Sequence, residues 1–249
     1  MDSASQISRP ADGQASSAPQ EELLSILVDA LLLDMDGTLV DSSSSVHMAW
    51  KQLFTELGSD RSYESHMHGR PAGQILAEEF PAMTQAERDT AFARVEGLEI
   101  EDAGAVTVLP GTARLLEELD AISAELGRPV WTIVTSCTRP LFDARWASTG
   151  LPAPDSLVTA DQVSSGKPDP EPYLLGAQRL GVDPSAALVL EDAVGGLQSA
   201  RAAGCPAIAV TTTTPAGELA PLAGALVTSL DDLEASVQDG RVRIARRGA

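Results

Sequence analysis

The sequence predicts an α/β fold in which helices cover both faces of a doubly wound parallel sheet. Short, nearly continuous apolar runs recur along the chain, and each is closed by Gly, Ser, Thr or Asp. Such runs are typical of strands that are buried on both faces of a parallel sheet. Segments with apolar residues at three- and four-residue spacing lie between them, as expected for helices. The alternation of the two patterns indicates the fold class.

Four apolar runs predict the main strands of this sheet, and two shorter runs predict weaker ones. The main strands are expected at 26–33, 130–134, 187–190 and 207–210, and the weaker ones at 157–159 and 225–227. The helical pattern predicts helices at 112–126, 140–149, 171–180 and 195–203. Residues 45–105 carry only the helical pattern, so we expect an inserted α-helical subdomain that could act as a lid.

Length and charge limit the possible functions. The chain has 249 residues, of which 36 are acidic and 17 basic, and its formal net charge is −19. This length fits one large domain or a main domain with a smaller insertion. A hydrophobic content of 43% indicates a folded protein. Because an acidic surface repels phosphate backbones and anionic lipid headgroups, we expect neither nucleic acid nor membrane as a partner.

The two ends of the chain differ from the rest in composition. Residues 1–24, rich in Ser, Ala, Gln and Pro, are interpreted as a flexible tail without the pattern of a secretion signal. Residues 239–249 are interpreted as a basic tail in solvent, which contains Arg241, Arg243, Arg246 and Arg247.

The cysteine content and the apolar runs bear on the compartment. Cys137 and Cys205 are too few for a disulfide framework or a zinc site, which indicates a reducing compartment. No apolar run approaches the roughly 18 residues of a membrane span. We therefore expect a cytoplasmic protein.

Polar side chains follow the predicted strands. In an open α/β sheet, ligands bind beyond the carboxyl ends of the strands. Asp34 and Asp36 follow the first strand and would repel each other unless a cation or a shared proton compensates. Thr135, Ser136 and Thr138 follow the second strand and precede a helix, a setting that suits an anion.

Two further segments add an ammonium group and a second acid pair. Lys167 lies in a proline-rich loop, and Glu191 and Asp192 follow the third main strand. Carboxylates without a histidine or thiol cluster favour Mg²⁺ over zinc. Because proteins tend to bind Mg²⁺ through a few carboxylates together with substrate phosphate, the set indicates phosphoryl chemistry. The metal, Lys167 and the hydroxyl-bearing turn would then stabilise the transferring group.

Four segments, in order, are similar to the signature motifs of one superfamily. DMDGTLVDS, VTSCTR, GKPDPEPY and EDAVGG resemble the four motifs of the haloacid dehalogenase-like (HAD) hydrolases, and the resemblance extends from about residue 27 to 230. It implies a Rossmann-like core at 25–44 and 106–238 and a helical cap at 45–105. Four runs look most like the glycerol-phosphate and 2-deoxyglucose-6-phosphate phosphatases: SHMHGRP, LPGTARLLEEL, WTIVTSCTR and SSGKPDPEPYLLGAQRLG.

The resemblance implies a role for each residue of the core motifs. Asp34 would be the nucleophile that becomes an aspartyl-phosphate. Asp36 would protonate the leaving alcohol and then activate water. Ser136 and Lys167 would bind the phosphoryl oxygens. The ligands of Mg²⁺ would be Asp34, the backbone carbonyl of Asp36, Asp192, and Glu191 either directly or through water.

The expected substrate contacts come from both the core and the cap. Cys137 stands where the superfamily usually has Gly, beside the phosphoryl site. In the cap, Trp50, His68 and Arg70 are candidate substrate contacts. For Trp50 the alternative is packing in the core of the cap. Arg70 could pair with a substrate hydroxyl or a second phosphate.

Together these inferences predict a cytoplasmic, Mg²⁺-dependent phosphatase. It would hydrolyse the phosphate monoester of a small sugar or polyol through an aspartyl-phosphate, as a monomer or homodimer. One alternative is phosphoryl transfer of the β-phosphoglucomutase kind. The other is a non-catalytic sugar-phosphate-binding protein of the same fold, against which the intact acidic residues and Lys167 argue.

Overall fold

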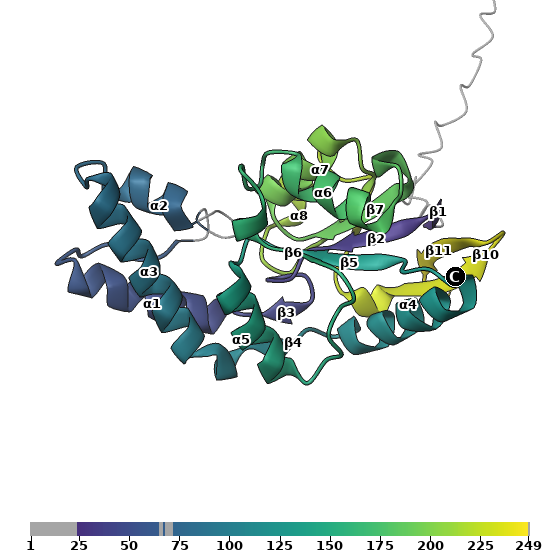
Figure 1. Cartoon of the computed structure of the whole chain (residues 1–249), viewed down its shortest axis with the longest axis horizontal. Helices are drawn as coiled ribbons and strands as arrows, with labels where there is room; N and C mark the ends of the chain where they lie inside the picture. Colours follow the sequence, from purple (N-terminus) through teal and green to yellow (C-terminus); the bar gives the residue numbers. More distant parts are fainter. Residues whose placement is uncertain (1–23, 65–66, 68–71, 249) are drawn as a thin grey trace, which may run out of the picture.

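The computed structural model describes residues 24–64, 67 and 72–248, and a six-stranded parallel sheet forms its centre (Figure 1). The strand order is β6-β5-β2-β7-β8-β9. In that order the strands are Leu157–Val158, Trp131–Val134, Ala30–Leu33, Ala187–Glu191, Ala207–Val210 and Ala225–Val227. The predicted α/β class is confirmed, and all six strands overlap the predicted runs.

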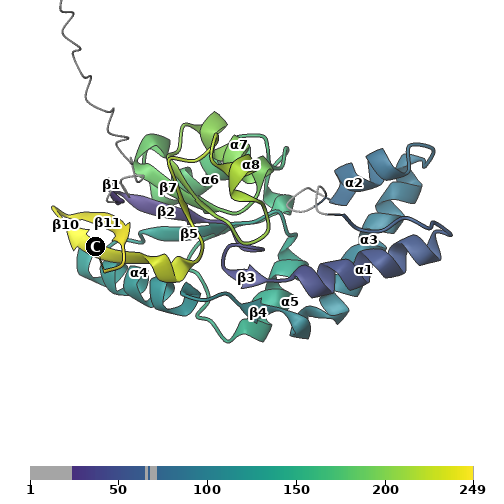
Figure 2. The same cartoon turned by 180° about the vertical axis from the view of Figure 1, so that it is seen from behind.

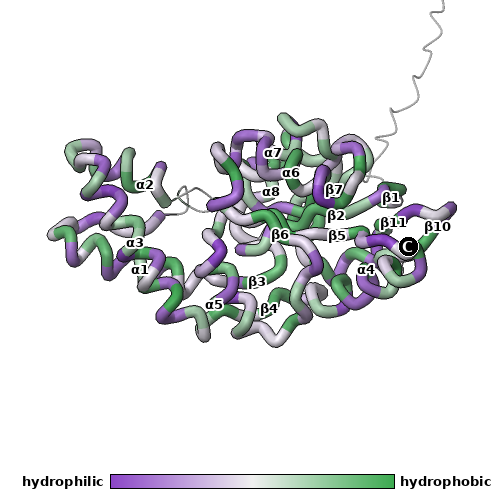
Figure 3. Tube along the Cα trace, viewed as in Figure 1, coloured by the Kyte–Doolittle hydropathy of each residue, from purple (hydrophilic) through white to green (hydrophobic). Residues whose placement is uncertain are grey.

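Helices cover both faces of this sheet. Leu31 and Leu33 of β2 pack on one face with α4 (Thr112–Leu126) and α5 (Arg139–Thr149). Leu32 packs on the other face with residues of three further helices. These are α6 (Glu171–Leu180), α7 (Val194–Ala203) and α8 (Ala216–Leu219). Since successive strand residues point to opposite faces, two apolar faces require a continuous apolar run. Figure 3 shows the central strands in green, whereas purple polar positions lie along the outer helices.

The inserted helices form a lobe beside the sheet. They are α1 (Ser43–Glu56), α2 (Ala72–Glu79) and α3 (Gln85–Glu101), followed by the 3-10 turn η2 (Ala103–Ala105). Their apolar faces meet in a separate core. Two short antiparallel strands, β3 (Val40–Asp41) and β4 (Thr107–Val108), carry the chain into and out of the lobe. Thr84 and Glu87 form a capping box that starts α3. We call this lobe the cap.

A second, three-stranded sheet lies at the opposite end of the molecule from the cap (Figures 1 and 2). The first predicted strand divides at Asp29. Its first half, β1 (Ser25–Val28), pairs antiparallel with β11 (Arg241–Arg246), which also pairs with β10 (Leu233–Gln238). The interpretation of 239–249 as a basic tail in solvent is therefore wrong, because 241–246 form the central strand of this sheet.

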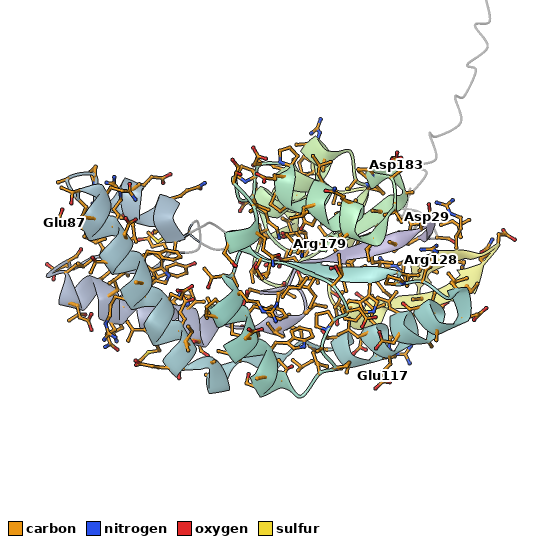
Figure 4. All side chains as sticks on the ribbon, viewed as in Figure 1. Asp29, Glu87, Glu117, Arg128, Arg179 and Asp183 are labelled. Atoms are coloured by element: carbon orange, nitrogen blue, oxygen red, sulfur yellow. The ribbon has the colours of Figure 1, made fainter. Side chains whose placement is uncertain are left out.

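The alternation of residues in β11 explains the correction. Val242 and Ile244 are fully buried in the main core, while arginines alternate with them. Nε of Arg241 lies 2.7 Å from Oδ1 of Asp29, whose carbonyl accepts from Arg128 over 2.8 Å. Figure 4 labels Asp29 and Arg128 side by side. Burial of Val242 and Ile244 and the contact of Arg241 with Asp29 stabilise this strand, which composition alone would place in solvent.

The predicted tail at 1–24 lies outside the described residues except for Leu24. Within residues 24–64, 67 and 72–248, no helix combines the length and apolarity that a bilayer crossing requires.

Candidate active site

Three carboxylates and one ammonium group meet at the carboxyl ends of β2 and β7. Asp34 follows β2, Glu191 ends β7, and Asp192 comes next. Because β2 and β7 pair in parallel, these side chains emerge at one sheet edge, where carboxylate oxygens of all three lie within 4.8 Å of one another. Nζ of Lys167 donates to Oδ1 of Asp34 over 2.6 Å and to Oε1 of Glu191 over 2.7 Å. The structure thus brings together four of the predicted site residues.

Because these side chains are buried, their charges act strongly on one another. All four side chains are buried, and the group contains three carboxyl groups but only one ammonium, which pairs with Asp34 and Glu191. Burial, then Glu191, raises the pKa of Asp34 well above its usual value against the effect of Lys167. The same two causes raise the pKa of Asp192 to about 7. Although burial opposes it, Asp34 and Glu191 keep the pKa of Lys167 above its usual value, so the ammonium stays charged. The excess of negative charge favours a bound cation.

The oxygen donors of this group fit a hard cation such as Mg²⁺. The residues that could hold it are Asp34, Glu191 and Asp192. Oδ1 of Asp192 accepts from the Thr38 hydroxyl over 3.1 Å, and Oδ2 accepts from the Thr213 hydroxyl. Such outer hydrogen bonds orient carboxylate ligands.

Glu191 is fixed by its own set of donors. Its Oε1 accepts from the Tyr173 hydroxyl over 3.1 Å, and its Oε2 accepts from the backbone N–H groups of Asp192 and Ala193, each over 2.9 Å. A Cβ built at Gly196 would lie 1.6 Å from Oε1 of Glu191. The second glycine of EDAVGG is therefore required by the approach of this carboxylate.

Asp36 lies apart from the three clustered carboxylates and has different partners. Its Oδ1 accepts from Nη1 of Arg145 over 2.9 Å, and Sγ of Cys137 lies 3.0 Å from its Oδ2. Nη2 of Arg145 also donates to Oε2 of Glu99 over 3.0 Å. Burial, then Asp36, raises the pKa of the Cys137 thiol well above its usual value. The predicted backbone contact of Asp36 with a metal stays a prediction.

A cavity of about 130 Å³ lies between the cap and these strand ends. Asp34, Asp36 and Lys167 line it from the core, together with Ser136 and Cys137 of the predicted phosphoryl site. The cap contributes mainly apolar and aromatic side chains and two carboxylates, which are Val46, Trp50, Tyr63, Ala72, Ile75, Phe92, Val95, Glu96 and Glu99. The Glu96 carboxylate accepts from the Thr138 hydroxyl and so joins cap to core.

The structure describes only one of the three cap residues predicted to contact substrate. Trp50 is 1% exposed and packs against Phe54 and Tyr63, with ring centroids 5.5 Å away in each case. It belongs to the core of the cap, and it also lines the cavity. His68 and Arg70 lie outside the described residues.

Sequence reasoning missed several residues of the site. They are Thr38, Glu96, Glu99, Arg145, Tyr173 and Thr213. One signal could have found Arg145: it follows Leu141 and Phe142 at four- and three-residue spacing, so it lies on the apolar face of its helix. A charged residue there needs a buried partner.

The sequence matches a family model and known proteins. Residues 28–204 match the model of the haloacid dehalogenase-like hydrolases. Hexitol phosphatase A of Escherichia coli is 41% identical over 180 residues, 72% of this chain and 81% of that protein. Glycerol-1-phosphate phosphohydrolase 2 of Saccharomyces cerevisiae is 32% identical over 207 residues, 76% of this chain and 77% of that protein.

The fold has counterparts among solved structures. A hydrolase from Pseudomonas syringae superposes with a TM-score of 0.73 at 24% identity, covering 81% of this chain and 94% of that one. The resemblance inferred from the four motifs is confirmed by the family match and by the relatives. This chain belongs to the haloacid dehalogenase-like hydrolase family.

Proposed function

We propose that this protein hydrolyses the phosphate monoester of a small sugar or polyol through an aspartyl-phosphate on Asp34. One observation carries the proposal: Asp34, paired with a buried lysine, and Asp36 line the same cavity under the cap. That arrangement offers a nucleophile and an acid–base group to one substrate. The names of the relatives, which are phosphatases of polyol phosphates, support the substrate class.

In the first step, a carboxylate oxygen of Asp34 attacks phosphorus. Lys167 binds Oδ1, which leaves Oδ2 to form the new P–O bond. The bond from phosphorus to the ester oxygen breaks, and the departing alkoxide takes a proton from Asp36. Ser136 and Lys167 bind the phosphoryl oxygens. In the second step, Asp36 removes a proton from water, which attacks phosphorus and releases phosphate and Asp34.

Mg²⁺ fits the acidic group as the cofactor. Asp34, Asp192, Glu191 and the backbone carbonyl of Asp36 would hold it. When bound, it supplies positive charge against the phosphoryl oxygens. The residues of this chain prepare the site, because Thr38 and Thr213 fix both oxygens of Asp192.

The cap would recognise the leaving group. Trp50, Tyr63 and Phe92 offer apolar surface to the carbon skeleton, and Glu96 offers acceptors to its hydroxyl groups. Closing the cavity excludes water, which strengthens the electrostatic interactions inside it.

A panel of sugar and polyol phosphates tests the proposal. Phosphate release with Mg²⁺, its loss with EDTA, and its loss in Asp34→Asn are the expected results. The Asp34→Asn protein should keep its circular dichroism spectrum. Isomerisation of a sugar phosphate without release would favour the mutase alternative. Tight substrate binding without turnover would favour the binding-protein alternative.

A further inference from the structure

Arg145 is a buried guanidinium that joins the cap to the core. It lies on α5, is 3% exposed, and donates to Asp36 and Glu99 over 2.9 and 3.0 Å. Asp36 belongs to the core, whereas Glu99 belongs to α3 of the cap. The rest of the buried face of α5 is apolar, with Leu141, Phe142 and Trp146. A buried ion pair gives little net stability compared with apolar packing, so stability alone does not account for this arginine.

The arginine contacts restrict the carboxylate of Asp36. A lone carboxylate rotates easily about its last torsion. Nη1 of Arg145 donates to Oδ1, and the Cys137 thiol donates to Oδ2. Since the guanidinium is planar and also bound to Glu99, its own orientation is fixed.

We propose that Arg145 is a positioning residue for the acid–base step, and that Glu99 makes this positioning depend on the cap. Arg145 fixes the orientation of the Asp36 carboxylate through Oδ1. Oδ2, whose only described donor is the weakly donating Cys137 thiol, is then the oxygen that exchanges the proton with the leaving group. Glu99 completes the arrangement only when α3 lies against α5. The inference rests on the proposed function, in which Asp36 protonates the leaving alcohol.

The dependence of rate on the leaving group tests this role. A glycerol or hexitol phosphate releases an alkoxide that needs a proton, whereas p-nitrophenyl phosphate releases a stable phenolate. The ratio kcat/KM depends only on the steps up to and including departure of the leaving group. Arg145→Met should lower kcat/KM about 100-fold for the alkyl phosphate, as expected when general acid catalysis is lost, and only about threefold for the aryl phosphate.

Two further variants test whether Arg145 acts through Asp36. Asp36→Asn should show the same selective loss, and Asp36→Asn combined with Arg145→Met should lose little more. Arg139→Met is the matched control, because Arg139 lies on the same helix and pairs with Asp143 at the surface. It should leave both substrates unaffected.

A double variant separates positioning from folding. Arg145→Met alone leaves Glu99 buried and unpaired, so Glu99→Leu combined with Arg145→Met removes both charges. This protein should fold and keep the selective loss. Arg145→Lys should recover part of the alkyl phosphate activity, because an ammonium group can still reach Asp36.

The outcomes separate failure of the role of Arg145 from failure of the proposed function. An equal loss on both substrates, or an unchanged rate on the alkyl phosphate, would overturn the role of Arg145. A wild-type protein that releases phosphate from neither substrate would instead overturn the proposed function.

Discussion

Lys167 and Asp34 form a buried ion pair in which Nζ lies 2.6 Å from Oδ1. The same ammonium group reaches Glu191, at 2.7 Å, so it connects the ends of β2 and β7. Asp34 and Lys167 are 133 residues apart in the sequence.

Replacing Lys167 should damage both activity and stability. Lys167→Met leaves the buried carboxylates of Asp34 and Glu191 without their ammonium partner. Breaking a buried pair costs about 3–5 kcal/mol of the free energy of unfolding. Loss of the positive charge at the phosphoryl group should lower kcat at least about 100-fold. Urea unfolding and steady-state kinetics measure the two effects, and Lys51→Met, at the only other lysine, is the exposed control.

Magnesium should stabilise the folded protein through Asp192. Because the folded site gathers carboxylates that the unfolded chain separates, Mg²⁺ at 100 times its Kd should add about 2.7 kcal/mol. The measurement is Tm with Mg²⁺ and with EDTA. Asp192→Asn should remove most of the Tm shift. Asp183, labelled in Figure 4, is exposed to solvent, so Asp183→Asn should keep the Tm shift. An equal shift in both variants would argue against the assigned site.

Two adjacent glycines should respond differently to alanine. A Cβ at Gly196 overlaps the Glu191 carboxylate, whereas a Cβ at Gly195 meets no heavy atom within 4 Å. Gly196→Ala should therefore displace Glu191 and lower kcat by about 100-fold or more, since small displacements at a site cost that much. Gly195→Ala should be active and slightly more stable, because alanine favours helix. Kinetics and Tm of the two proteins test this, and equal activities would contradict it.

The C-terminal strand should contribute to stability. Ile244 is fully buried on β11, so Ile244→Ala should lower the free energy of unfolding by about 2–5 kcal/mol. Arg243→Ala, at a half-buried position of the same strand, should cost less than about 1 kcal/mol. Urea unfolding compares them. If both variants matched the wild type, 241–246 would not be part of the folded core.

Both thiols should resist alkylation in the native protein. Burial, then Asp183, raises the pKa of Cys205 to about 11, and burial raises the pKa of Cys137 well above its usual value. Because the thiolate reacts, a raised pKa lowers the reactive fraction, about tenfold for each pH unit below it. Labelling followed by mass spectrometry at pH 8 should be slow, faster at pH 10, and complete in urea. Cys137→Ser and Cys205→Ser assign the labelled site, and rapid labelling of the native protein at pH 8 would contradict the expectation.

The core of the site could be predicted from the sequence because its geometry is local. Asp34 directly follows β2, Glu191 is the last residue of β7 and Asp192 comes next, and parallel strands end at the same edge. The helix at 112–126 has the same bounds in sequence pattern and structure, since its apolar spacing needs no distant partner. The order of the motifs then sufficed to identify the superfamily.

The remaining features depend on contacts between distant segments. Arg145 meets Asp36 across 109 residues and Glu99 across 46, and no local pattern specifies such pairings. The strand at 241–246 is stabilised by β1, near the other end of the described chain, and composition alone favoured solvent. The sequence by itself thus determined the fold class and the acidic strand ends. Only the tertiary structure decided which side chains fix Asp36 and where the last strand packs, because long-range packing sets those contacts.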